Sequence, residues 1–337
     1  MKTLKERLKD SEKISFKAFM SIALYDQDEG YYTQNIRNVG RNGDFSTSAT
    51  INDSLAKSIN SWIKNRWKEN KELNRNILEI GAGNGSLADS ILKSFKPWAR
   101  LGINYHIVET SPKLIISQKE RLKNQRRINW HEQMADALED CSGNTLIISN
   151  ELVDAFPVEL IEWNKETKKW HRVMIQKNNG SWLISIGDEY SVGENSSINN
   201  YKDFNNKQRI ERHDQFISWF HEWQNLWNVG HMLTIDYGEE FPAIYHRRPN
   251  GTLRSYFHHE RYEQLEEILS RPGLQDITSD VDFSDIRKRM LTKSIKEVDY
   301  MNQADFIMSH TQKLDPMDPS IAINGAGSAF KVLWHEK

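Results

Sequence analysis

The spacing of apolar and polar positions changes along the chain. Four short apolar runs predict strands, at residues 77–80, 103–108, 127–130 and 145–149. Helix-like spacing separates them, at residues 86–95 and from Ser111 to about residue 124. Strands that are apolar on both faces and alternate with helices are typical of a parallel sheet with right-handed crossovers. The pattern therefore predicts an α/β fold.

This alternation stops after residue 157. Three strand-like runs, at residues 158–163, 170–176 and 182–186, are separated by polar turns at 164–169 and 178–180. Such an arrangement is typical of an antiparallel meander. The further elements that we predict are an exposed loop at 192–206, a long helix at about 206–227, a fifth parallel strand at 232–236, a strand at 252–257, a helix near 261–269 and a last strand at 330–334.

The composition excludes several classes of protein. Lys and Arg total 45 and Asp and Glu total 47, a formal charge of −2, so the basic footprint of a nucleic-acid binder is missing and we expect no such partner. The 11 Trp, 13 Phe and 11 Tyr argue against disorder. The single cysteine, Cys141, cannot form an intrachain disulfide, which favours a reducing compartment. No apolar run approaches the roughly 18 residues of a membrane span.

The N-terminal segment bears on location. Residues 1–13 are charged and lack the apolar core of a signal peptide. Leu4 and Leu8 are spaced for the apolar stripe of a surface helix. We therefore expect a cytoplasmic protein of bacterial type without a presequence, or one of the mitochondrial matrix if the source is eukaryotic.

The sharpest local signal is a glycine turn at residues 81–85 (GAGNG), between a predicted strand and a helix. Glycines allow positive φ and let a ligand approach the backbone closely. A dinucleotide fingerprint has a further glycine where this chain has Ser86. Glu79 suits a ligand with a cationic amino-acid part, and Glu109, ending the next strand, can accept hydrogen bonds from a ribose diol. S-adenosylmethionine fits these features best; a dinucleotide, or a tight turn without a ligand, stays open.

Eight blocks, in order, resemble the MidA-like family of S-adenosylmethionine-dependent methyltransferases, over nearly the whole chain. That family includes a mitochondrial complex I assembly factor that methylates arginine. The blocks are residues 19–25 (FMSIALY) with 30–32 (GYY), 40–48 (GRNGDFSTS), 81–85 (GAGNG), 108–112 (VETSP), 150–158 (NELVDAFPV), 235–238 (IDYG), 251–254 (GTLR) and 276–283 (DITSDVDF).

The resemblance implies a class I methyltransferase fold, with a Rossmann-like sheet, an N-terminal helical cap and an inserted antiparallel meander plus helices. It implies a cap and cofactor lid at residues 1–50, a core at 51–157 and 228–337, and an insertion on the substrate side at 158–227. The implied cofactor is S-adenosylmethionine, and the implied reaction is methylation of arginine on a protein, such as a subunit of respiratory complex I. Two alternatives stay open: methylation of a small molecule or RNA, and a cofactor-binding assembly chaperone without turnover.

The chain departs from the family pattern at a few positions. The family usually has Pro at Ala82, Arg at Asn84, Pro-Glu at Ala49 and Thr50, and His at Asp280. Because the glycines and Glu109 are kept, we expect cofactor binding to survive. The changes at Thr50 and Asp280 bear instead on the acceptor.

Carboxylates after the fourth strand are the expected catalytic residues. Arginine stays protonated, with a pKa above about 12, and carboxylates can bind its planar fork through paired hydrogen bonds. Glu151 and Asp154 are three residues apart, which places both on one face if the segment is helical. Alternatively, Asp154 closes a turn before Pro157. Asp44 is the third expected catalytic residue, in the block that forms the implied lid.

The residues expected to contact the cofactor lie at or after the ends of predicted strands, except one in the lid block. They are Glu79, Gly81, Gly83, Gly85, Glu109, Asp136, Asn150 and Thr47.

Two further pairs of polar residues are weaker candidates. Asp236 and Tyr237 end the fifth strand, at the edge where ligands bind in open parallel sheets, but ordinary turn chemistry before Gly238 explains them equally well. His258 and His259 suggest a metal, yet adjacent side chains point opposite ways in a strand and no third ligand is spaced nearby. We therefore expect no metal site.

Overall fold

The computed structural model describes residues 4–9, 13–36, 53–178, 181–194, 196–201, 203–311, 318–322 and 325–337. The chain forms two compact units, each made of three segments. Unit 1 comprises Met1–Ile36, Val153–Trp219 and Gly238–Met290, and unit 2 comprises Arg37–Leu152, Phe220–Tyr237 and Leu291–Lys337. The predicted division into cap, core and insertion stays a prediction.

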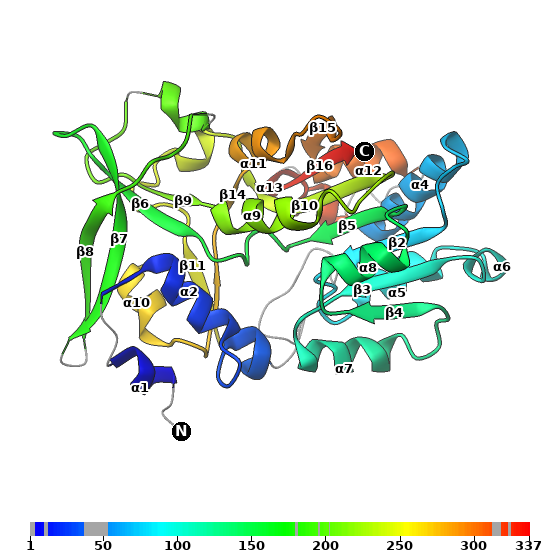
Figure 1. The fold of residues 1–337 in the computed structure, drawn as a ribbon, viewed down its shortest axis with the longest axis horizontal. Coiled ribbons are helices and arrows are strands. Elements are labelled where there is room, and N and C mark those ends of the chain that lie inside the picture. The colour runs from blue at the N-terminus through cyan, green and yellow to red at the C-terminus, as the bar shows by residue number, and fades with distance from the viewer. Residues whose placement is uncertain are drawn as a thin grey trace. The chain divides into compact units, whose positions relative to one another are not determined.

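A seven-strand path forms the sheet of unit 2 (Figure 1). Its strands, in spatial order, are β15 (Lys296–Asn302), β16 (Phe330–Glu336), β10 (His231–Glu239), β5 (Leu146–Asn150), β2 (Asn76–Ile80), β3 (Asn104–Val108) and β4 (Ile128–His131). The five strands from β10 to β4 are parallel, whereas β16 is antiparallel to both of its neighbours. The predicted Rossmann-like sheet is confirmed. The first four expected parallel strands are present within one residue at each end, and the fifth extends three residues beyond its predicted end, to Glu239.

Helices connect these strands. They are α4 (Ser54–Glu69), α5 (Ser86–Lys93), α6 (Pro97–Arg100), α7 (Pro112–Arg121), α8 (Met134–Asp140), α12 (Gln303–His310), η4 (Pro319–Ile321) and α13 (Ala326–Ala329). The start of α7 follows from its sequence: Pro112 occupies the first turn, and Ser111 Oγ accepts a hydrogen bond from the Leu114 N–H.

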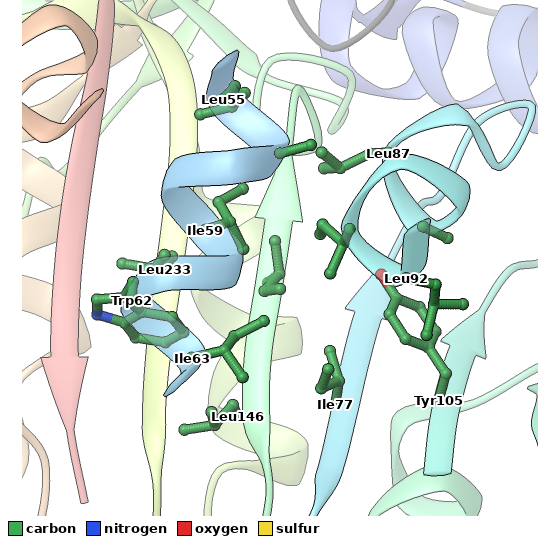
Figure 2. Packing of buried hydrophobic residues seen from close by; sticks show 14 of the residues in the cluster. Leu55, Ile59, Trp62, Ile63, Ile77, Leu87, Leu92, Tyr105, Leu146 and Leu233 are labelled. Carbon is green, nitrogen blue, oxygen red and sulfur yellow. The ribbon is translucent and has the colours of Figure 1, made fainter. Parts of the chain in front are cut away.

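The core of unit 2 lies between α4 and one face of the sheet (Figure 2). The helix presents four apolar side chains at i, i+4, i+7 and i+8, which are Leu55, Ile59, Trp62 and Ile63. They belong to one buried cluster with the strand residues Ile77, Leu146 and Leu233. Glu79 follows Ile77 by two positions and therefore points to the same face of the sheet.

Unit 1 is built mainly from antiparallel strands. Its larger sheet contains β1 (Ile14–Ser15), β7 (Lys169–Asn178), β6 (Glu159–Asn164), β9 (Arg209–Arg212) and β8 (Ser181–Glu189), and its smaller sheet contains β12 (Glu260–Tyr262), β11 (Arg254–Phe257) and β13 (Asp276–Thr278). The predicted meander is confirmed as β6, β7 and β8. Gly238 and Glu239, the last residues of β10, belong to this unit and pair in parallel with β14 (Val281–Asp282).

Short helices complete unit 1. They are α1 (Leu4–Lys9), α2 (Phe16–Tyr25), η1 (Tyr31–Asn35), η2 (Ser197–Asn200), η3 (Ala243–Tyr245), α10 (Leu265–Ser270) and α11 (Phe283–Met290), and α9 (Asp214–Trp223) begins in unit 1 and ends in unit 2. The stripe expected in the first helix is present, since Leu4 and Leu8 are both buried.

Three predictions of secondary structure are wrong. The helix expected at 206–227 is a strand, β9, followed by α9, because residues 209–212 pair with β6. The helix expected near 261–269 begins only at Leu265, because residues 260–262 pair with β11. The loop expected to be exposed at 192–206 buries Ile198 and Phe204 in an apolar cluster. In the first two cases strand pairing overrides local propensity.

One absence follows from the helix lengths. Within the described ranges, none of the helices is both long and apolar enough to cross a membrane.

The packing of β10 against α4 predicts a stability difference between two leucines of unit 2. Leu233→Ala removes a fully buried side chain and should lower the free energy of unfolding by about 2–5 kcal/mol, through lost burial and an unfilled cavity. Leu226→Ala truncates a side chain that is 47% exposed and should change it by no more than about 0.5 kcal/mol. Urea denaturation of both variants measures the difference, and equal midpoints would contradict the packing.

Candidate active site

The glycine turn joins β2 to α5 in unit 2. Gly81, Gly83 and Gly85 have φ of 66°, 53° and 77°, the left-handed region that side chains disfavour. The Gly81 N–H donates to the Val108 carbonyl at 2.9 Å, which fixes the turn against the end of β3. A Cβ atom at Gly81 would lie 3.0 Å from Leu152 Cδ1. The turn therefore needs glycine for its backbone conformation, and Gly81 and Gly83 stay partly exposed.

Glu109 follows β3 beside this turn. Its Oε1 accepts hydrogen bonds from the backbone N–H groups of Thr110 at 3.0 Å and Ser111 at 2.9 Å. Its Oε2 accepts one from Gln118 Nε2 at 3.1 Å, and the same nitrogen donates to the Gly83 carbonyl at 2.8 Å. Gln118 thus connects the carboxyl group to the glycine turn. Burial raises the pKa of Glu109 to about 7, against these hydrogen bonds.

Gln118 is a residue of this candidate site that the sequence analysis did not single out. Its side chain is fully buried, and its Oε1 accepts a hydrogen bond from Trp130 Nε1 at 3.0 Å. In the sequence, Gln118 is only a glutamine in the helix that follows Glu109. A glutamine at such a position can be either buried or exposed, so the sequence did not indicate its role.

Glu79 lies at the end of β2, just before the turn. It is 2% exposed, and its Oε2 accepts a hydrogen bond from the Tyr105 hydroxyl at 2.7 Å. Burial is the largest cause that raises its pKa to about 7, and the charge of Glu109 adds to it. Two neighbouring acids that are both costly to ionise favour a cationic or hydrogen-donating ligand, which would stabilise the charged carboxylates.

Asn150 and Glu151 follow at the end of β5. The Asn150 Oδ1 is buried and has no hydrogen-bond partner among the residues that the structure describes, while its Nδ2 donates to Glu151 Oε1 at 3.1 Å. Glu151 has φ of 54°, unusual for a residue with a side chain. Such strain costs about 1–3 kcal/mol and concentrates at functional sites. The buried Asn150 oxygen could therefore accept a hydrogen bond from a ligand at this strand end.

The residues of unit 2 therefore fit S-adenosylmethionine. The turn offers the partly exposed backbone of Gly81 and Gly83, Glu109 offers a carboxylate for a ribose diol, and Glu79 and Asn150 offer acceptors for an ammonium group. Asp136 is exposed in the first turn of α8, where a carboxylate also stabilises the helix dipole, so its contact with the cofactor stays a prediction. Asp44, Thr47 and the family departure at Thr50 lie outside the described residues.

Asp154 belongs to unit 1 and has a different environment from the expected one. Residues 151–156 form turns and bends instead of a helix, so the expectation that Glu151 and Asp154 share a helical face is wrong. Asp154 is buried, and its Oδ2 accepts a hydrogen bond from the Thr278 hydroxyl at 2.7 Å. Its carbonyl accepts a second from the Ser279 N–H at 3.4 Å. These contacts tie the residue to the end of β13.

A second buried acid accompanies Asp154. Asp276 Oδ1 accepts a hydrogen bond from the Tyr32 hydroxyl at 2.8 Å, and Tyr25 stacks on Tyr32 with ring centres 5.5 Å apart. Burial and then the charge of Asp154 raise the pKa of Asp276 to about 7. The Tyr25 hydroxyl donates to the Ala155 carbonyl at 2.9 Å. Three family blocks thus meet in unit 1 around a pair of carboxyl groups, and the sequence analysis missed Asp276 because it lies 122 residues beyond Asp154.

The remaining candidates have structural partners. Asp280, where the family usually has His, pairs with Arg248 and, at 2.5 Å, with Arg254. Asp236 is fully buried, and its Oδ1 accepts a hydrogen bond from the Tyr237 N–H at 2.9 Å.

Comparisons with known proteins agree with this geometry. A model of a family of S-adenosyl-L-methionine-dependent methyltransferases matches residues 58–300. The mitochondrial protein arginine methyltransferase NDUFAF7 of Xenopus tropicalis is 25% identical over 313 residues, which cover 84% of this chain and 68% of that protein. The protein of the same name from Danio rerio is 26% identical over 327 residues, covering 86% and 71%.

Solved structures share the fold. A Burkholderia thailandensis protein crystallised with S-adenosyl-homocysteine matches with a TM-score of 0.81 at 23% identity, covering 96% of this chain and 88% of that one. A native crystal structure of a protein from the same organism matches with a TM-score of 0.76 at 22% identity, covering 96% and 87%. Similarity at this identity establishes the fold, and the predicted fold class is confirmed.

The positive φ angles of the glycine turn predict that a substitution at Gly83 removes cofactor binding. S-adenosylmethionine at a hundredfold excess over Kd should stabilise the native protein by about 2.7 kcal/mol, whereas NAD should not. Gly83→Val should abolish this thermal shift, because a β-branched side chain opposes φ of 53° and covers the backbone. Gly193→Val is the matched control, since Gly193 has φ of 76° and no atom within 4 Å of an added Cβ. Gly193→Val should unfold at a lower temperature than the natural protein and keep the full thermal shift with S-adenosylmethionine. A normal thermal shift in folded Gly83→Val would show that the cofactor binds elsewhere.

The raised pKa values of Glu79 and Glu109 predict that cofactor affinity depends on pH. In the ligand-free protein both groups titrate near 7 instead of at 4.5, so their contribution to stability is present below 4.5 and is lost as the pH rises through about 7. A cationic, hydrogen-donating ligand favours the ionised carboxylates, so binding should release protons below pH about 7. As the pH is lowered below about 7, affinity should therefore fall by up to about tenfold per pH unit for each proton released.

Isothermal titration at several pH values, in buffers of different ionisation enthalpy, measures both affinity and proton release. Glu109→Gln removes one titrating group and should reduce the number of protons released. An affinity that stays level between pH about 6 and 8, without proton release, would show that neither acid faces the ligand.

Proposed function

The chain belongs to the family of S-adenosyl-L-methionine-dependent methyltransferases, and from that premise we propose that it methylates arginine side chains of a protein substrate. The single observation that carries the choice of acceptor is the buried pair of carboxyl groups, Asp154 and Asp276, with the hydroxyls of Tyr32 and Thr278 around them. The relatives named protein arginine methyltransferases support the same choice.

The carboxyl pair suits a guanidinium group in charge and in shape. A guanidinium stays protonated in water, and two carboxylates can hold its planar fork by charge-assisted hydrogen bonds. Burial and the charge of Asp154 raise the pKa of Asp276, and a bound cation would favour its ionised form.

Chain connectivity limits the distance between these acids and the cofactor residues. Glu151 follows Asn150 at the end of β5, and Asp154 lies three residues further on. Three residues span at most about 11 Å when fully extended, so Asp154 stays within that distance of Glu151 in any arrangement of the two units. This covalent limit supports a role for both acids in one reaction.

When bound, the cofactor would supply a sulfonium methyl group that an acceptor nitrogen takes by in-line displacement, with S-adenosylhomocysteine as the leaving group and the displaced guanidinium proton accepted by a carboxylate or by water. The task of this chain is to orient that nitrogen and exclude water. Asp154 and Asp276 would hold the guanidinium, and Thr278 would orient the Asp154 carboxylate through its hydrogen bond. Glu151 and, in the implied lid, Asp44 are two further acids that we propose for this reaction.

A subunit of respiratory complex I is the substrate that we propose first, because the family resemblance suggests it. Methylation of a small molecule or RNA, and a cofactor-binding chaperone without turnover, are the competing functions. A cytoplasmic location stays a prediction, and the NDUFAF7 relatives carry the word mitochondrial in their names.

Labelled S-adenosylmethionine distinguishes these functions. Incubation with a proteome fraction should place label in protein, and mass spectrometry of the digest should find methylarginine. Label in RNA or in small molecules only would replace the proposed acceptor, and no label in the presence of a normal thermal shift would favour the chaperone.

The acid pair predicts that Asp154→Asn keeps cofactor binding and loses methyl transfer. The amide preserves shape but removes the charge that positions the guanidinium in the transition state. Loss of one charge-assisted hydrogen bond is worth about 1.5–3 kcal/mol, or about ten- to a hundredfold in rate. Asp276→Asn should behave similarly, and the double variant of Asp154 and Asp276 should be less than additive, because both acids bind one guanidinium. Glu151→Gln changes the other acid expected from the sequence and should also lower the rate.

The control is Asp188→Asn, which changes an exposed acid of β8 in the same unit as Asp154 and should turn over normally. All variants must first show an unchanged thermal shift with S-adenosylmethionine, so that a folding defect is excluded. Wild-type turnover in Asp154→Asn would assign that residue to the turn before Pro157 and make Asp44 or Asp236 the next acid to test.

A further inference from the structure

Two histidines and an aspartate lie close together at the β4 edge of the unit 2 sheet, outside the proposed cofactor site. His106 lies in β3, His131 ends β4, and Asp140 ends α8. Within the described part of the chain, they form a group whose three potential ligand atoms all lie within 4.8 Å of one another. The sequence analysis expected no metal site from His258 and His259 and did not consider His106 and His131, which are 25 residues apart.

The geometry converges on one nitrogen atom. His131 Nε2 lies 3.1 Å from His106 Nδ1 and 3.7 Å from Asp140 Oδ2. The shorter distance suits an N–H···N hydrogen bond, but the longer one is outside hydrogen-bond range. Asp140 therefore lies beside the two ring nitrogens without sharing the hydrogen bond between them. A cation between the three atoms would satisfy all of them.

These distances also suit a metal ion. Bonds of about 2.0–2.2 Å from zinc to nitrogen or carboxylate oxygen, in tetrahedral geometry, place neighbouring ligand atoms about 3.3–3.6 Å apart. The two histidines already meet this spacing within a few tenths of an ångström. The Asp140 side chain is 59% exposed, so it is free to rotate toward the histidines and gives an ion a path from solvent.

We propose that His106, His131 and Asp140 bind a divalent transition-metal ion of the zinc type, with water as the fourth ligand. Two imidazoles and one carboxylate are a ligand set that zinc, cobalt and nickel accept, whereas magnesium and calcium prefer oxygen ligands. The site does not depend on the proposed arginine methylation.

The position of the site gives it a structural role. It joins β3, the edge strand β4 and the end of α8. The His131 carbonyl accepts the Glu109 N–H at 3.0 Å, so an ion bound at His131 holds the strand end next to Glu109. Metal binding should therefore raise the unfolding temperature of the protein.

Titration of chelator-treated full-length protein with cobalt(II) chloride tests the proposal. Bound cobalt should give a visible ligand-field absorption band that saturates at one ion per chain, zinc chloride should displace it, and either ion should raise the unfolding temperature. An absence of binding would overturn the proposal and leave the two histidines as a hydrogen-bonded pair.

Variants separate this site from other histidines of the chain. His131→Ala should abolish the absorption band, and Asp140→Asn, at an exposed position that does not threaten folding, should weaken binding by at least about tenfold. The matched control replaces His258 and His259, both exposed, by alanine and should bind cobalt normally. Unchanged binding in Asp140→Asn and His131→Ala, or loss of binding in the control, would contradict the assignment.

Discussion

The proposed cofactor site depends on the hydrogen bonds of one buried side-chain amide, that of Gln118. Its nitrogen donates both to the Gly83 carbonyl and to the Glu109 carboxylate, and its oxygen accepts a hydrogen bond from Trp130 Nε1. The amide therefore sets the glycine turn, which follows β2, at a fixed distance from the acid that follows β3. Because burial makes a lost partner costly, the network is a rigid support for a ligand instead of an adaptable one.

Each unit buries a pair of acids, and this shared electrostatic feature explains the pairing of cofactor and acceptor that we propose. Glu79 and Glu109 in unit 2, and Asp276 beside Asp154 in unit 1, include three carboxyl groups whose pKa values are raised to about 7 by burial. Ionisation of a buried acid is unfavourable when the acid is alone, and a nearby cation stabilises the ionised form. S-adenosylmethionine and arginine are both cationic, so each unit offers the charge that one of them requires.

The segment from Asn150 to Asp154 joins these two environments through the covalent chain. It leaves β5 through Glu151, whose φ of 54° is strained, and enters unit 1 at Val153. Strain at such a junction persists only where the surroundings enforce it, and here the Glu151 N–H is held by the Ile235 carbonyl at 2.8 Å. Glu151 and Asp154 do not share a helical face in this turn, but they are only three residues apart in the chain.

The sequence by itself determined the elements whose signals are local. The parallel strands, the glycine turn and the start of α7 follow from apolar runs, from the need for positive φ and from Ser111-Pro112, all within a few residues. Only the tertiary structure decided β9, because its pairing partner β6 is distant in sequence and outweighs local helical spacing. The strand β12 pairs with the adjacent β11 in a hairpin, and this pairing likewise outweighs local helical spacing. For the same reason it alone brought Gln118 to Gly83, Asp276 to Tyr32 and His131 to His106: side-chain partners across a sheet or between blocks leave no periodic trace in the chain.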